Sequence, residues 1–319
     1  NGYTSRVDNF GEVENKGIEF NLDGIIMNKD DLNWTVNANI GINRNKLKKL
    51  NSNLDFQLGP SVGFSQAYPI LFMVDQPLGI YWGAETDGVY SSWEEANASG
   101  IAGAAPGEIR YINHYVDLDD SGQPLEIQEI NFDDYVKIGD PNPDFTYSIS
   151  NNFTYKNWDA NILFTGQKGG DLFWVDSWQL SGLQKTTNIL NSSYANSWIA
   201  PLTYQNGNYI YDESIGNLNS ASHPGAMIET GSRAISSDRN IFDGSFIRLK
   251  NINIGYNFDL KNGKNMRIYL AGQNLIVWTD YPGYDPEVRT YTKNPQKRGV
   301  DFGTYPGTRS FLMGLKLNY

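Results

Sequence analysis

The chain has 319 residues, a formal net charge of −11 and no cysteine. The acidic balance argues against a nucleic-acid-binding protein, and the lack of cysteine excludes disulfide frameworks and cysteine-based zinc sites. Mean hydropathy is −0.48, and no stretch approaches the roughly 20 apolar residues of a transmembrane helix. The 20 Tyr, 15 Phe and 8 Trp suit both the interfacial girdles of a membrane barrel and sugar-binding surfaces.

Alternation of apolar and polar residues predicts the first two β-strands. Asn15 to Met27 predicts one strand, and the polar turn Asn28–Asp31 leads to the clearest strand of the chain, Leu32 to Asn43. Four asparagines share one face of this second strand, opposite six apolar residues. Because asparagine is disfavoured in ordinary strands, this face predicts a wet lumen behind an apolar exterior that contacts lipid.

The same alternation returns five more times along the chain. It covers Phe145–Tyr155, Trp158–Phe164, Ser245–Phe258, Met266–Leu270 and the closing segment Arg309–Tyr319. Lys156-Asn157 and Asn262-Gly263 predict tight hairpin turns. In the closing segment only Leu312 breaks the pattern, and a length of about ten residues matches a tilted transmembrane strand.

Short turns alternate with long connections, which is the asymmetry of a bacterial outer-membrane barrel. The long connections cover residues 44–144, 166–244 and 278–308, and the first leaves room for two more strands around Leu71 to Tyr90. Seven strands are an odd number, whereas single-chain barrels of this kind close with an even number. Asn1 to Phe10 is polar and shows no signal peptide. We therefore expect residues 1–319 to be the C-terminal part of a larger transmembrane β-barrel domain, with the plug and N-terminal strands outside this chain.

Five motifs, taken in order, resemble the SusC/RagA family of TonB-dependent outer-membrane transporters. They are Asn9–Glu19 (NFGEVENKGIE), Ile138–Phe145 (IGDPNPDF), Asp243–Asn251 (DGSFIRLKN), Gly272–Leu275 (GQNL) and Tyr281–Glu287 (YPGYDPE). Each motif alone is a weak signal, but five in the same order are specific. Together with the closing strand they cover the chain from Asn9 to Tyr319.

The resemblance implies a 22-stranded barrel with an N-terminal plug in the outer membrane of a Gram-negative bacterium. It also implies energy from the TonB system and a SusD-like surface lipoprotein that captures glycans or peptides. The aromatic last strand resembles the signal that barrel-assembly machinery reads. The expected function is gated import of a nutrient, and the expected partners are the lipoprotein, the TonB system and membrane lipid, with no nucleic acid. The alternative is a soluble secreted carbohydrate-binding or lyase-like β-domain, whose apolar faces would meet in a sandwich core.

Aromatic residues in the long connections are the candidate contacts for substrate or a partner protein. They are Trp174, Trp178, Trp198, Tyr204, Tyr281 and Tyr284. Packing within the loops themselves is the favoured alternative for any one of them. Gly283, Asp285, Pro286 and Glu287 are expected to fix a tight loop rather than to contact substrate.

Asp117, Asp119 and Ser121 have the spacing of the first three calcium ligands of an EF-hand loop, and Gly122 stands at its turn position. The twelfth position is Gln128 rather than a bidentate acid, so a solvated acidic turn is favoured over a calcium site. No other cofactor is expected.

The basic run Arg44, Lys46, Lys48 and Lys49 is expected to be a solvated strand end, with contact to anionic lipopolysaccharide as the alternative. His114 and His223 lack partners at catalytic spacing, and no nucleophile-elbow, zinc-protease or phosphate-loop motif is present. We therefore expect a transport protein and not an enzyme.

Overall fold

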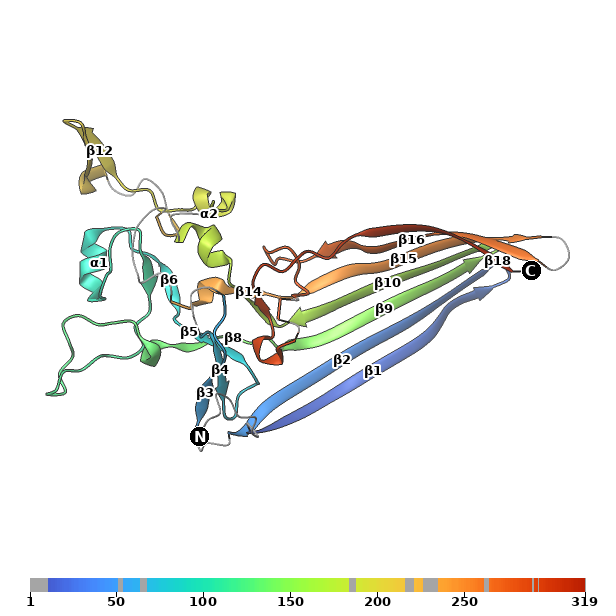
Figure 1. The fold of residues 1–319 in the computed structure, drawn as a ribbon, viewed down its shortest axis with the longest axis horizontal. Helices are drawn as coiled ribbons and strands as arrows, with labels where there is room; N and C mark the ends of the chain where they lie inside the picture. Colours follow the sequence, from blue (N-terminus) through green and yellow to red (C-terminus); the bar gives the residue numbers. More distant parts are fainter. Residues whose placement is uncertain are drawn as a thin grey trace, which may run out of the picture.

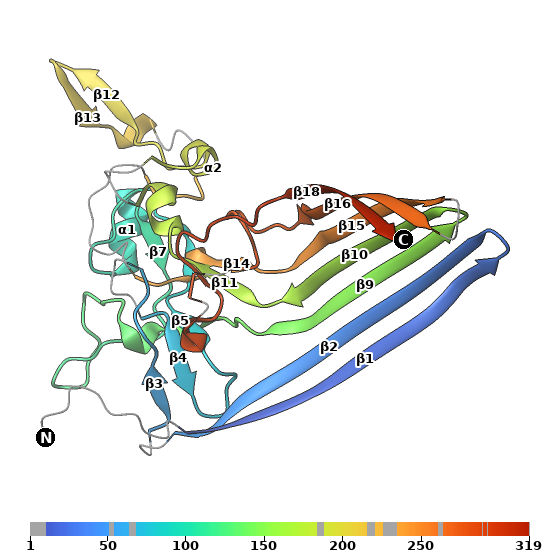
Figure 2. The same cartoon turned by 45° about the vertical axis from the view of Figure 1, so that its right-hand side comes forward.

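The computed structural model describes residues 11–50, 54–63, 68–183, 188–215, 221–225, 235–260, 264–288, 290–291 and 293–318. Seven long strands form one curved antiparallel sheet, and shorter elements gather at one end of it, which we call the outer region (Figures 1 and 2). The strands lie in chain order within the sheet: β1 (Gly11–Lys29), β2 (Leu32–Leu50), β9 (Pro143–Tyr155), β10 (Trp158–Gly169), β15 (Phe246–Asp259), β16 (Asn265–Trp278) and β18 (Ser310–Asn318).

The seven strands are those that the alternation predicts, and most of them run further than the sequence indicates. β2 continues to Leu50, so the basic run from Arg44 lies inside the strand rather than after it. Lys156 adopts a left-handed conformation (φ 53°), as the tight turn between β9 and β10 requires. The predicted turn at Asn262-Gly263, and the end residues Asn9, Phe10 and Tyr319, lie outside the described residues.

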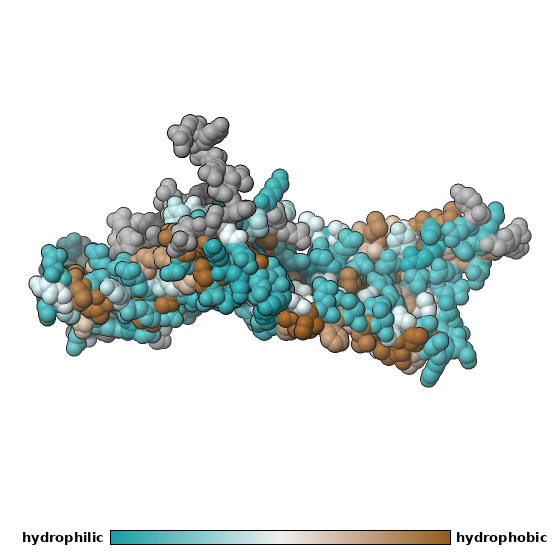
Figure 3. Space-filling view, turned by 90° about the horizontal axis from the view of Figure 1, so that it is seen from below, coloured by the Kyte–Doolittle hydropathy of each residue, from teal (hydrophilic) through white to brown (hydrophobic). Residues whose placement is uncertain are grey.

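One face of the sheet is apolar and exposed. Its rows of directly opposed residues cross the whole sheet, and one of them runs Met27, Trp34, Phe153, Ala160, Ile254, Leu270, Met313. Phe20 is 69%, Leu270 61% and Leu315 58% exposed, and Figure 3 shows apolar side chains along the strands. The apolar side chains of a sandwich core are buried, so this exposure contradicts the soluble alternative and suits a face that meets lipid.

The opposite face carries a chain of side-chain amides that crosses five strands. Asn251 Nδ2 donates to Asn161 Oδ1 (3.3 Å), and Asn161 Nδ2 donates to Asn152 Oδ1 (2.7 Å). Asn152 Nδ2 donates to Asn37 Oδ1 (3.0 Å), and the Asn37 amide donates to the Asp23 carboxylate. Each amide therefore donates toward β1, and the polar face is a wall of mutually satisfied amides.

The outer region is built from short strands and helices. Its strands are β3 (Phe56–Leu58), β4 (Ile70–Met73), β5 (Ile80–Gly83), β6 (Thr86–Val89), β7 (Ile109–Tyr111), β8 (Val136–Gly139), β11 (Asp171–Trp174), β12 (Leu202–Gln205), β13 (Asn208–Tyr211), β14 (Ile241–Asp243) and β17 (Val300–Asp301). Its helices are α1 (Trp93–Ser99), α2 (Asn191–Ala195), a π turn at Gln179–Leu183 and 3₁₀ turns at Phe132–Asp134, Glu213–Ile215, Asp238–Asn240 and Pro295–Lys297. None of the helices in the described part of the chain has the length and apolar content to span a membrane.

The two strands expected around Leu71 to Tyr90 are present, as β4 and β5, but they belong to the outer region rather than to the long sheet. They pair within a separate sheet of order β3-β4-β5-β8. Their side chains are buried with Leu47 and Leu50 from the outer end of β2, and with Phe173 of β11. This cluster is the core of the outer region and fixes it to the long sheet.

Candidate functional site

The predicted aromatic contacts divide into a buried set and an exposed set. The side chains of Trp174, Trp178 and Trp198 are 6–7% exposed, and Tyr281 is 5% exposed. Trp174 lies edge-on to Tyr281, with ring centroids 6.0 Å apart, although the two residues come from distant connections. Tyr204 and Tyr284 lie apart from this cluster and are 65% and 79% exposed. The structure therefore brings three of the six residues into one neighbourhood, because Trp178 lies on the same cavity as Trp174.

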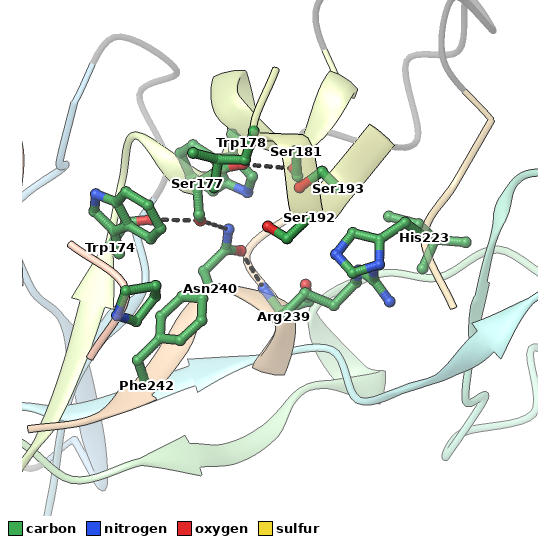
Figure 4. A pocket seen from close by; sticks show the side chains of 14 residues that line it. Trp174, Ser177, Trp178, Ser181, Ser192, Ser193, His223, Arg239, Asn240 and Phe242 are labelled. Carbon is green, nitrogen blue, oxygen red and sulfur yellow. Dashed lines mark hydrogen bonds between the residues drawn. The ribbon is translucent and has the colours of Figure 1, made fainter. Parts of the chain in front are cut away.

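A cavity of about 130 Å³ lies between β11, the π turn, α2 and the 3₁₀ turn at Asp238–Asn240 (Figure 4). Aromatic and aliphatic side chains form part of its wall, and hydroxyl, amide, imidazole and guanidinium groups form the rest, the last from Arg239. Its lining includes Trp174, Trp178, Ser177, Ser181, His223 and Asn240. Aromatic faces beside a few fixed polar groups are typical of a small-ligand site.

Asn240 fixes the polar part of the cavity wall. Its side chain is 2% exposed, its Nδ2 donates to Ser177 Oγ (2.8 Å), and its Oδ1 accepts from the Ser237 backbone amide (3.3 Å). Ser177 Oγ in turn donates to the Trp174 carbonyl (2.6 Å), as Figure 4 shows. The amide thus connects the 3₁₀ turn, through Ser177, to the backbone of Trp174 at the end of β11. No motif in the sequence indicates this residue, because its side-chain partner Ser177 is 63 residues away along the chain.

The electrostatics of the cavity favour an uncharged imidazole. Burial and the neighbouring Arg239 guanidinium lower the pKa of His223 below its usual value. His223 is therefore neutral at pH 7, and its Nδ1 already lies 3.1 Å from the Ser222 hydroxyl oxygen, so Nε2 is the ring nitrogen left for a ligand. Such a wall can hydrogen-bond a neutral hydroxyl or amide group.

Tyr281 packs against Trp174, which lines the cavity, but does not line the cavity itself. Its hydroxyl donates to Asp301 Oδ2 (2.5 Å), and Asp301 Oδ1 accepts from the Thr304 backbone amide (3.0 Å). Burial, followed by the bond to Asp301, raises the pKa of Tyr281, so the phenol stays protonated and remains a donor. This contact joins the predicted motif at Tyr281–Glu287 to β17.

A second contact joins two of the family-like motifs. Arg248 in β15, from the Asp243–Asn251 motif, has a side chain only 3% exposed. Its guanidinium lies 2.5 Å from Asp285 and 2.9 Å from Glu287, both in the Tyr281–Glu287 motif. Asp285 also accepts from the Glu287 and Gly307 backbone amides, so it fixes the loop as the sequence predicts.

The calcium candidate at Asp117–Ser121 forms a self-contained turn. Asp119 Oδ1 accepts from the backbone amides of Ser121 (2.8 Å) and Gln123 (2.9 Å). Asp117 Oδ2 accepts from the Glu129 backbone amide (3.0 Å). No group of three or more His, Cys, Asp or Glu residues is arranged to hold a metal ion in the described part of the chain. Calcium binding at this turn stays a prediction.

The chain is similar in sequence to TonB-dependent receptors. It is 34% identical over 331 residues to TonB-dependent receptor P3 of Formosa agariphila, and 25% identical over 332 residues to TonB-dependent receptor SusC of Bacteroides thetaiotaomicron. The alignments cover 100% and 98% of this chain but 30% and 27% of the two relatives, so the chain spans less than a third of their length. No family model matches the chain.

Solved structures of a peptide transporter share the fold. The RagAB peptide transporter superposes with a TM-score of 0.70 at 18% identity, over 99% of this chain and 30% of that chain. The RagAB peptide importer in its open-open state gives a TM-score of 0.64 over 96% of this chain and 29% of that chain. The sequence relatives, the shared fold and the sheet with one apolar and one polar face all indicate the same family. The chain therefore belongs to the SusC/RagA family of TonB-dependent receptors, and its long sheet is part of the transmembrane β-barrel of that family.

Proposed function

We propose that the protein carrying this chain imports a nutrient, a glycan or a peptide, across the outer membrane of a Gram-negative bacterium. The sheet that supports this proposal has an exposed apolar face for lipid and an amide-lined face for a hydrated lumen. Residues 1–319 would form the C-terminal part of the barrel domain, with the plug and the first strands upstream. The TonB system would supply the energy, and barrel-assembly machinery would insert the chain.

Loss of uptake is the test of this function. Deleting the gene should abolish growth on one class of polymer or peptide, and expressing the full-length protein from a plasmid should restore it. A variant lacking the TonB-interacting segment serves as the control, because it should reach the membrane and bind but not transport. Unchanged growth of the deletion strain on every nutrient tested would contradict the proposal.

We also propose that a SusD-like lipoprotein docks on the outer region. The hairpin β12–β13 projects away from the other elements in Figures 1 and 2. It carries Tyr204 and Tyr209, whose ring centroids are 5.0 Å apart and whose side chains are 65% and 74% exposed. Adjacent exposed tyrosines are typical anchors of protein interfaces. Tyr284 is a further candidate contact for the lipoprotein or substrate.

Replacing both hairpin tyrosines tests this docking. The double variant Tyr204→Ala, Tyr209→Ala should reduce recovery of the lipoprotein with the affinity-tagged transporter by roughly tenfold or more, as expected for loss of interface anchors. Tyr305→Ala is the matched control, because Tyr305 is also highly exposed in the outer region but lies outside the hairpin. Equal recovery from both variants would show that the hairpin is not the docking surface.

The cavity beside Trp174 and Trp178 supports a role in substrate contact. Its volume of about 130 Å³ suits one terminal ring or side chain of a larger ligand rather than the whole ligand. Trp198 is expected to support this neighbourhood through its backbone amide, which donates to the His223 carbonyl (2.9 Å). Asn240→Leu should weaken ligand binding about tenfold by removing the wall's fixed amide. Binding measured by calorimetry on the full-length protein checks this expectation.

A further inference from the structure

Two adjoining hollows lie on the polar face at the outer end of the long sheet. They measure about 350 and 500 Å³ and share Asn43, Asn142 and Arg298 in their walls. Each is within the range of about 300–1,000 Å³ that holds small ligands. The register places Asn15 opposite Asn45 and Gly17 opposite Asn43, so these side chains continue the amide-lined face of the sheet.

The wall of the first hollow is rich in amides and carries positive charge. Asn15, Asn43, Asn45 and Asn142 line it from one side, and Lys297 and Arg298 line it from the other. No carboxylate is among its described lining residues, although the whole chain has 36 acidic and 25 basic residues. Glu19 lines only the second hollow. The charge of the first hollow is therefore opposite to that of the chain.

Two of these polar side chains, Asn43 and Arg298, have unused hydrogen-bonding capacity, whereas Asn45 and Asn142 are already paired. Asn45 and Asn142 bond to each other (2.8 Å), and Asn45 also accepts from the Leu78 backbone amide (2.6 Å). In contrast, the side chains of Asn43 and Arg298 make no hydrogen bond or ion pair with other described residues. They are available to a ligand.

The backbone of Arg298 is held rigidly although its side chain is exposed. The buried Tyr81 hydroxyl donates to the Arg298 carbonyl (2.9 Å), and the Phe173 backbone amide donates to the Gly299 carbonyl (3.0 Å). Gly299 has φ +72°, and a Cβ there would lie 2.4 Å from the Tyr81 hydroxyl, so glycine is required. Lys297 is steadied beside it, with Nζ 4.4 Å from the Tyr291 ring centroid. The core thus fixes the backbone from which the Arg298 side chain extends at the hollow.

We propose that this double hollow binds an acidic oligosaccharide, with a sugar carboxylate on Arg298 and sugar hydroxyls on the surrounding carboxamides. A guanidinium pairs with a carboxylate through two parallel hydrogen bonds. A carboxamide offers a donor and an acceptor side by side, which match neighbouring hydroxyls of a pyranose ring. The inference rests on the proposed import function, since it names the class of substrate.

The test compares one charged probe with its neutral twin on the full-length transporter in detergent. Trigalacturonic acid and its methyl ester share the same sugar chain, and the ester replaces each carboxylate charge by a neutral methyl ester group. Calorimetry should give a Kd about 10- to 100-fold lower for the acid, as expected for a charge-assisted hydrogen-bonded pair. Equal affinity for the two probes, or no binding of the acid, would overturn the inference. Tighter binding of an acidic tripeptide than of trigalacturonic acid would overturn the ligand class.

Matched arginine variants locate the effect. Arg298→Gln should remove the preference for the acid, and Arg298→Lys should restore it in part, because lysine keeps the charge without the planar fork. Arg309→Gln is the control, since Arg309 is an exposed arginine that lines neither hollow. Folding should survive in Arg298→Gln, because the core contacts this residue through its backbone carbonyl. An unchanged preference in Arg298→Gln would refute the assignment of this site.

Failure of the two proposals can be told apart. If the deletion strain loses uptake of a nutrient but the purified protein shows no preference for the acid, the import proposal is supported and the acidic-ligand proposal is contradicted. If the protein binds the acid more tightly than the ester, and Arg298→Gln removes that preference, but the deletion leaves all uptake unchanged, the acidic-ligand proposal is supported and the import proposal is contradicted.

Discussion

At the residue scale, the ion pair of Arg248 with Asp285 is the most buried one among the described residues, and Glu287 contacts the same guanidinium. The Arg248 and Asp285 side chains are 3% and 6% exposed, so solvent does not screen them. Removing one partner of a buried pair leaves an uncompensated charge and costs about 3–5 kcal/mol. The sequence indicates that Asp285 and Glu287 fix a loop, but it does not reveal their cation, because Arg248 is 37 residues away.

Asp285→Asn should therefore lower the stability of the outer region by about 3 kcal/mol, since the amide keeps the shape but not the charge. Thermal unfolding of the purified full-length protein, followed by tryptophan fluorescence, measures this. Asp280→Asn is the matched control, because Asp280 is an exposed acid that forms no ion pair with described residues. Equal melting temperatures would mean that the buried pair contributes little.

Asp171 gives a pH-dependent prediction. Burial raises the pKa of its carboxyl above the usual value, although the Asp140 backbone amide donates to it (2.7 Å). Between the unfolded and the raised folded pKa, the folded chain binds more protons than the unfolded chain, so stability falls as pH rises through that window. Asp171→Asn should remove this part of the pH dependence. Melting curves of wild type and variant from acidic to neutral pH should converge at low pH and diverge at neutral pH, with the variant more stable.

At the element scale, the long strands could be predicted because their pattern is local. Lipid on one side and water on the other impose a period of two on each strand separately. The outer ends of the strands could not be predicted. Beyond the lipid the apolar-polar alternation stops while the backbone pairing continues, as it does at the outer end of β2. Alternation also cannot assign β4 and β5 to the correct sheet, because short apolar runs such as Ile70–Phe72 are buried on both faces and do not alternate.

The placement of the tryptophans is equally non-local. Trp174 packs against Phe242, from the far end of the same connection, and against Tyr281, from the next connection, so its sequence neighbours do not reveal its burial. Loop aromatics could be identified as candidates from composition. Which of them are packed and which are exposed depends on contacts that form only in the folded outer region.

The amide chain gives a prediction at the same scale. Asn152→Ala removes one bond to Asn37 and one from Asn161, and should cost about 1 kcal/mol because the site is partly exposed. Ser148→Ala is the control, since Ser148 is on the same strand and face but makes no side-chain bond with described residues. Urea unfolding of the refolded full-length protein in detergent checks the difference. Equal midpoints would show that water replaces the amide bonds without loss.

At the scale of the whole molecule, the two faces of the sheet must meet two different solvents. Leu270→Arg places a charge on the apolar face, where it should cost about 2–4 kcal/mol near the middle of the bilayer. Ala271→Arg places the same charge one residue later on the polar face and should be tolerated. Outer-membrane assembly, measured by heat-modifiable gel mobility, should fall for the first variant only. Equal assembly of both would remove the lipid-facing assignment.

The uniform direction of the asparagine donors has a consequence for mutation at a distance. Each carboxamide is oriented by the one before it, and the whole series is anchored by the Asp23 carboxylate, which can only accept while ionised. Replacing Asp23 with a hydrocarbon side chain would release the anchor, and the carboxamides behind it would be free to rotate by half a turn. A single change in β1 would thus let donors and acceptors exchange places as far as β15. The polar face would keep all its asparagines but lose the common direction of their hydrogen bonds.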